Sequence, residues 1–116
     1  MYYFSGTVPA GGTLDCITYA SVSNTAYMFD GMFSGTTPGA NTEYGIYHNA
    51  FTAKNNAGTL VTSGNMYLDK KESGAPFGGK LTPSIVLSGT NIIYRISNSA
   101  AFAIDVGGKV SVIMSA

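Results

Sequence analysis

The sequence predicts an all-β protein, a β-sandwich or jelly roll of about eight short, mainly antiparallel strands. Short runs rich in Val, Ile, Tyr, Phe and Thr recur along the 116 residues, separated by Gly, Pro, Asn and Ser. No stretch long enough to form an amphipathic helix has apolar residues repeating at the helical period. An open single sheet would leave much apolar surface in water, so two sheets with facing apolar sides are expected. We expect one domain over residues 1–116.

The candidate strands follow one another with turn residues between them. In chain order they are Leu14–Val22, Ala26–Phe33, Glu43–Ala53, Thr59–Val61, Met66–Asp69, Ser84–Ser88, Asn91–Ser97, Ala101–Val106 and Lys109–Met114. Longer loops are expected at residues 7–12, 34–42 and 70–80, where Gly and Pro punctuate the chain. Residues 1–12 precede the first expected strand, and we interpret them as an N-terminal segment that is a candidate for packing on a partner.

Two glycine turns predict hairpins in the second half of the chain. Gly89-Thr90 places glycine first, as a type II′ turn requires. Gly107-Gly108 offers two residues that accept positive φ between Val106 and Lys109. We therefore expect a C-terminal meander in which Lys109–Met114 is a separate last strand.

Alternation along the last candidate strand predicts which side chains face the core. Val110, Val112 and Met114 alternate with polar residues, and Ser111 and Ser115 are among those expected to face outward. This pattern is typical of a strand with one face in water.

Two other strands are apolar on both faces. In Ala26–Phe33, successive side chains point to opposite sides, so Tyr27, Phe29 and Phe33 share one face and Met28 and Met32 share the other. In Glu43–Ala53, Tyr44 and Ile46 lie opposite Tyr47 and Phe51 in the same way. Only one face of a sandwich sheet meets the core, so we expect a loop, the N-terminal segment or another subunit to cover the second face. The candidate interface residues are Tyr2, Tyr3, Phe4, Met28, Met32 and Tyr44.

The composition favours assembly and argues against several other functions. Charged residues are 10% of the chain, and six Lys and Arg balance six Asp and Glu to a net charge of zero. A nucleic-acid partner would need a basic surface to neutralise phosphates, so none is expected. A neutral chain lacks the self-repulsion that keeps copies apart, which favours a homo-oligomer. No run approaches 18 consecutive apolar residues and the N-terminus lacks a basic n-region, so we expect neither a membrane span nor a signal peptide.

The residues that commonly carry chemistry are sparse. His48 is the only histidine and Cys16 the only cysteine. A Cys-His nucleophilic pair would make the chain a small hydrolase, but a small buried hydrophobic cysteine and a hydrogen-bonded strand histidine are the commoner arrangements. The acidic residues are scattered singly, without the spacing of a calcium loop, and zinc would need further ligands. We expect no metal, no cofactor and no catalytic residues.

The second half of the chain resembles small β-sandwich proteins of tailed bacteriophage particles. Three stretches carry the resemblance, namely Ala50-Phe51-Thr52-Ala53-Lys54-Asn55, Ile92-Ile93-Tyr94-Arg95-Ile96 and Val106-Gly107-Gly108-Lys109-Val110-Ser111-Val112-Ile113. The resemblance implies a non-enzymatic virion structural protein, either a capsid decoration protein or a fibre-associated one. It also implies a homo-oligomer, expected to be a trimer, that contacts other virion proteins and assembles in the host cytoplasm. The alternative is a receptor-binding or carbohydrate-binding module that uses exposed Tyr residues on a host-surface glycan.

Overall fold

The chain forms a two-layer antiparallel sandwich, as the sequence predicts. The computed structural model describes residues 1–37, 43–73 and 78–115. These residues contain eight strands, β1 (Tyr2–Val8), β2 (Thr13–Ala20), β3 (Thr25–Thr36), β4 (Tyr44–Asn56), β5 (Thr59–Glu72), β6 (Leu81–Ser88), β7 (Asn91–Asn98) and β8 (Ile104–Ser115). Parts of the expected loops at 34–42 and 70–80 lie outside the described residues. Within the described chain, no helix is long and apolar enough to cross a membrane.

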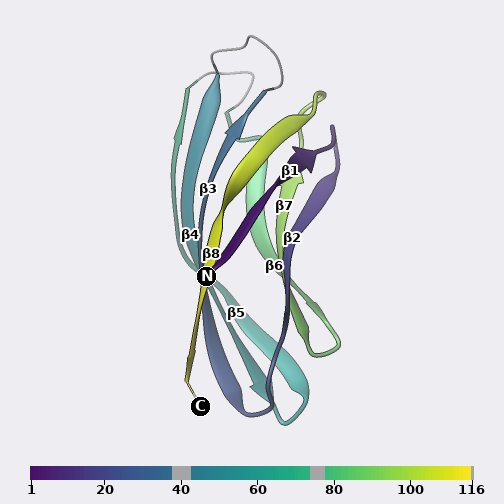
Figure 1. Ribbon diagram of the computed structural model, residues 1–116, viewed down its shortest axis with the longest axis vertical. Coiled ribbons are helices and arrows are strands. Elements are labelled where there is room, and N and C mark those ends of the chain that lie inside the picture. Colours follow the sequence, from purple (N-terminus) through teal and green to yellow (C-terminus); the bar gives the residue numbers. More distant parts are fainter. Residues whose placement is uncertain (38–42, 74–77, 116) are drawn as a thin grey trace.

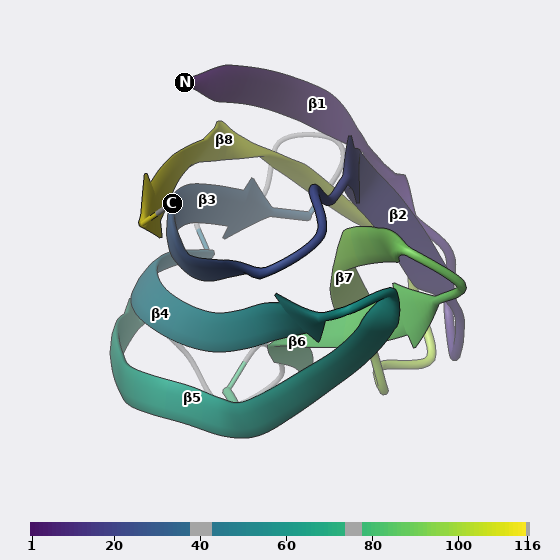
Figure 2. The ribbon, with the colours of Figure 1, turned by 90° about the horizontal axis from the view of Figure 1, so that it is seen from below.

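The strands form two sheets of unequal size. The larger sheet has the order β1-β8-β3-β4-β5, the smaller one the order β2-β7-β6, and all neighbours are antiparallel. The molecule is elongated, and the strands run along its long axis (Figure 1). Figure 2 shows the five-stranded sheet curling around one side of the molecule from β1 to β5, while the three-stranded sheet closes the other side. The outer face of the larger sheet is therefore convex.

The core lies between the sheets and is rich in aromatic rings. Phe33 of β3 and Tyr47 of β4 stack with ring centroids 4.6 Å apart. Tyr94 of β7 lies fully buried opposite Gly31, where a methyl group would collide with the Tyr94 ring. Of the two apolar faces of β3, the one with Tyr27, Phe29 and Phe33 is the inner face, and Phe29 is fully buried.

The C-terminal hairpin expected at Gly107-Gly108 is wrong. Both glycines lie in the middle of β8, paired with β1 on one side and β3 on the other. A Cβ at Gly108 would collide with the main-chain carbonyl of Met32. Position 108 therefore needs glycine because β3 and β8 approach closely there. In the sequence, such a glycine cannot be distinguished from a turn glycine. The Gly89-Thr90 turn is confirmed, since it joins β6 to β7 and Gly89 has a φ of 60°.

Two further strand boundaries differ from expectation. The expected strands at Thr59–Val61 and Met66–Asp69 are one strand, β5, whose pairing with β4 shifts register twice. The N-terminal segment is also not separate from the sandwich, because β1 pairs with β8 and Phe4 packs against the core. Pairing with β8 also extends β1 to Val8, into the loop expected at residues 7–12.

The alternation expected along the last strand is confirmed for its first half only. Val110 is fully buried and Val112 packs partly buried against the core, but Met114 is 54% exposed. Pairing with β1 ends at Val110, so beyond that point β8 is bonded to β3 alone and extends past the covered part of the sandwich. The outward positions of Ser111 and Ser115 follow the predicted alternation.

Candidate functional site: the outer face of the five-stranded sheet

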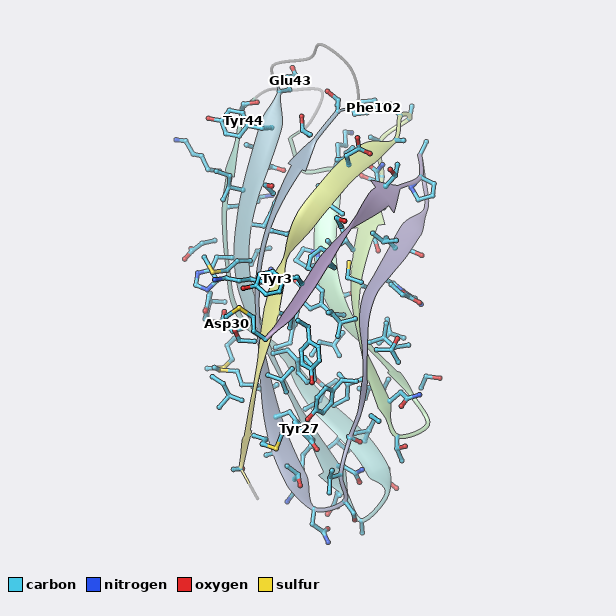
Figure 3. The ribbon with its side chains drawn as sticks, viewed as in Figure 1. Tyr3, Tyr27, Asp30, Glu43, Tyr44 and Phe102 are labelled. Atoms are coloured by element: carbon cyan, nitrogen blue, oxygen red, sulfur yellow. The ribbon has the colours of Figure 1, made fainter. Side chains whose placement is uncertain are left out.

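The convex outer face of the five-stranded sheet exposes large apolar side chains. Tyr3 is 77% exposed, and Met32, Tyr44, Ile46 and Ile113 are each exposed by about half of their surface. Three of them, Tyr3, Met32 and Tyr44, are interface candidates of the sequence analysis. Figure 3 shows Tyr3 and Asp30 near the middle of the long axis, with Tyr44 towards the upper end. The apolar surface therefore extends along the sheet rather than forming a single spot.

The outer face of the three-stranded sheet has a different character. Arg95 of β7 makes two hydrogen bonds to the carboxylate of Asp15 on β2, at 2.6 and 3.2 Å. The neighbouring positions on this face include the hydroxyl residues Thr18 and Thr82, both exposed. Of the two outer faces, the five-stranded one is thus the apolar one.

A shallow hollow of about 500 Å³ lies across β8, β3 and β4 on the apolar face. Its lining includes Gly107 and Gly108 of β8, Met32 of β3 and Ile46 of β4, with Tyr3 at one side. Gly107 faces outward without a side chain, so the main chain of β8 is bare there and the surface is hollowed. A second hollow of about 530 Å³ lies along the same strands, and Met28, Val61, Ile113 and Met114 are among its lining residues.

Three polar side chains from three strands meet beside the first hollow. Nε2 of His48 on β4 lies 2.8 Å from Oδ1 of Asp30 on β3. The hydroxyl of Tyr67 on β5 donates to the same Asp30 oxygen at 3.1 Å and lies 3.1 Å from Nε2 of His48. Partial burial, followed by the hydrogen bond to Asp30, raises the pKa of Tyr67 above its ordinary value. The cluster gives the apolar face a polar, hydrogen-bonded centre that includes one carboxyl group.

Cys16 lies in the other sheet, so the Cys-His pair considered from the sequence is not assembled. It is the extra residue of a register shift in β2, half-buried, with Sγ 3.6 Å from the carbonyl oxygen of Leu14. Burial and, secondarily, the charge of Asp15 raise the pKa of the Cys16 thiol to about 12. At neutral pH the thiol stays protonated, and only the thiolate is a nucleophile. Within the described residues, no group of three His, Cys, Asp or Glu side chains could hold a metal ion.

The other interface candidates occupy mixed positions. Phe4 points into the sandwich, with ring centroids 6.4 Å from Phe33 and 6.1 Å from Tyr94. Tyr2 also points inward, edge-on to Tyr19 at 6.0 Å, and remains 42% exposed. The grouping of His48, Asp30 and Tyr67 has no signal in the sequence, because strand register alone brings those positions together.

Comparison with known proteins yields one structural likeness. No family model matches the chain, and no curated protein matches it. The tailspike protein of Acinetobacter phage vB_ApiP_P1 has a region of similar structure, with a TM-score of 0.47 and 16% sequence identity. The match covers 97% of this chain and 22% of the tailspike chain. The chain therefore spans about a fifth of the length of the tailspike that it matches.

Proposed function

We propose that this chain is a non-enzymatic structural protein of a phage particle, a capsid decoration or fibre-associated protein that acts as a homo-oligomer. The observation that carries the assembly part is the difference between the two outer faces of the sandwich. One bears the Asp15–Arg95 ion pair and hydroxyl groups, whereas the other exposes Tyr3, Met32 and Ile46 around a hollow. The second layer of the sandwich does not cover that face, and contact with another subunit would remove its apolar side chains from water.

The phage setting rests on the sequence resemblance, and the absence of net charge is compatible with shape-based contact. In this function the rigid sandwich would present apolar faces to identical copies and to other virion proteins. The oligomer we expect is a trimer, placed on the virion after assembly in the host cytoplasm.

Sedimentation of the full chain at rising concentration tests the proposal. We expect a reversible or stable oligomer of defined order, because an apolar face of this kind gains free energy when it leaves water. A chain that stays monomeric at all accessible concentrations would contradict the assembly function. Met32→Lys should weaken association and Thr82→Lys, on the polar outer face, should not.

A carbohydrate-binding or receptor-binding module is the second candidate. It is favoured by Tyr3, an aromatic ring 77% exposed beside a hollow that also has His48 and Lys109 in its lining. An exposed tyrosine can stack on a sugar ring while nearby polar groups bind its hydroxyls. NMR titration with a panel of oligosaccharides distinguishes this function, since binding would shift the Tyr3 resonances and Tyr3→Ala would abolish the shift.

A further inference from the structure

The outer face has a regular arrangement about its middle strand, β3. Strand register places Ser34 of β3 between Gly107 of β8 and Ile46 of β4. In the neighbouring row, Met32 of β3 lies between Lys109 of β8 and His48 of β4. In both rows the β8 residue and the β4 residue are one strand away from β3, on opposite sides.

In the first row the two flanking residues have complementary shapes. Ile46 is 56% exposed and projects from the face, whereas Gly107 has no side chain and forms part of the hollow. The fold does not need glycine at position 107, because an added Cβ there would make only ordinary contacts, 3.8 Å from the nearest atom. The protrusion and the recess therefore lie at equal distances from β3.

The second row places a cation opposite a hydrogen-bonded histidine. Lys109 makes no ion pair among the described residues, although it lies half-buried at the hollow. On the other side of Met32, Nε2 of His48 lies 2.8 Å from the carboxylate of Asp30, which belongs to the next row of β3 itself. A rotation about an axis parallel to β3 that brings the β8 side of one copy to the β4 side of another places Lys109 opposite His48 and towards this carboxylate.

We propose that copies of this chain associate around a rotation axis parallel to β3, with the β4 side of each copy against the β8 side of the next. Ile46 then fits over Gly107 of the neighbouring copy, and Lys109 reaches the Asp30–His48 pair. The partner is a second copy of this chain, and the inference rests on the proposed homo-oligomer. The convex sheet suits a ring, because a convex face presents two inclined sides to two different neighbours, and the expected trimer is the smallest such ring.

The sheet face sets the size of these contacts. The molecule measures 48 Å by 22 Å in its two longest dimensions, so the sheet face is about 1,000 Å². In a ring each copy divides this face between two neighbours, so one contact removes about 500 Å² from each partner, less than the roughly 800 Å² of a standard interface. Burial of Met32, Tyr44 and Ile46 would supply the apolar centre that such interfaces have.

Cross-linking tests the pairing directly. A variant carrying both Ile46→Cys and Gly107→Cys cannot close a disulfide within one copy, since two strand spacings separate the positions by about 10 Å and a disulfide needs about 4.4–6.8 Å. We expect mild oxidation to give covalent dimers and trimers on a non-reducing gel, with most of the chain in the product. The control carries Ile46→Cys and Thr82→Cys, which the proposal leaves far apart, and should stay monomeric on the gel.

A second variant separates this inference from the proposed function. Gly107→Leu fills the recess without disturbing the protomer, so we expect an unchanged melting profile at low concentration but at least tenfold weaker association by sedimentation. Oligomers that form equally well with Gly107→Leu, and no cross-link in the cysteine pair, would overturn the inference while leaving the homo-oligomer intact. A wild-type chain that never associates would overturn the proposed function itself.

Discussion

The hydroxyl of Tyr94 donates a 2.8 Å hydrogen bond to Oδ1 of Asn49 at the centre of the core. Tyr94 belongs to β7 of the three-stranded sheet and Asn49 to β4 of the five-stranded sheet, so this bond links the two layers. Both side chains are fully buried. A polar pair in such surroundings specifies how the sheets align, because a misaligned arrangement leaves both groups unbonded.

Removal of the Tyr94 hydroxyl should destabilise the fold. Tyr94→Phe keeps the ring but leaves the Asn49 oxygen buried without a donor, which costs about 1–3 kcal/mol of unfolding free energy. Urea denaturation measures the loss. Tyr3→Phe, which removes a hydroxyl from a side chain 77% exposed, is the matched control and should change the unfolding free energy little. Equal stability of both variants would contradict a structural role for the bond.

Two glycines in the five-stranded sheet should respond differently to the same substitution. Gly31→Ala forces a methyl group into the Tyr94 ring, and such overpacking typically costs about 1–3 kcal/mol. Gly107→Ala adds a methyl group that meets only ordinary contacts and should cost far less. Thermal melts of the two variants at low protein concentration test this difference, and a reversed order would show that the packing of Tyr94 is misplaced.

Deletion of residues 1–4 should destabilise the domain as well as its association. The sequence predicts that this segment precedes the first strand of the sandwich, but Phe4 contacts Phe33 and Tyr94 in the core. Phe4→Ala alone should cost about 1–3 kcal/mol, below the range for a fully buried ring because Phe4 is only half-buried. The check is a lower midpoint of urea unfolding. An unchanged midpoint would indicate that β1 is not docked.

An aspartate should be tolerated less at Val110 than at Val112. Val110 is fully buried between β1 and β3, whereas Val112 lies beyond the end of β1 and is only partly buried. An unpaired buried carboxylate costs several kcal/mol out of a typical total of about 5–15 kcal/mol. We expect Val110→Asp to be unfolded by circular dichroism and Val112→Asp to fold with reduced stability. A cooperative melt of Val110→Asp at the wild-type temperature would show the register of β8 to be wrong.

Acid should weaken the fold through Glu72. Desolvation opposes its charge, but a 2.6 Å hydrogen bond from Tyr47, a second from the Gly79 amide and nearby Lys70 outweigh it, so the pKa of Glu72 lies below its ordinary 4.5. Because the folded-state pKa is depressed, ionised Glu72 stabilises the fold fully above its ordinary pKa of 4.5, and this contribution is lost as the pH falls from there through the folded-state pKa.

The measurement is the unfolding free energy from about pH 6 down to about pH 3. Glu72→Gln should be less stable than wild type at the upper end and should lose less stability across the range. A wild-type and a variant curve with the same slope would contradict the role of Glu72. Association must be held constant, so the comparison belongs at low protein concentration.

Sequence alone was sufficient for the fold class and for the inner and outer sides of β3. Tyr27, Phe29 and Phe33 alternate with Met28 and Met32, and a strand has a side-chain period of two, so the assignment needs no knowledge of neighbours. The Gly89-Thr90 turn could also be predicted, because a two-residue hairpin turn depends mainly on the conformational preferences of its own residues.

Only the tertiary structure decided how the strands are paired and what lies together on the outer face. Gly107-Gly108 has the composition of a turn, yet β1 and β3 pair on either side of it and extend it into one strand. His48, Asp30 and Tyr67 come from three strands whose register brings them within hydrogen-bond distance. The physical reason is that alternation depends on the geometry of a single strand, whereas pairing depends on which distant segments gain most by burying their apolar faces together.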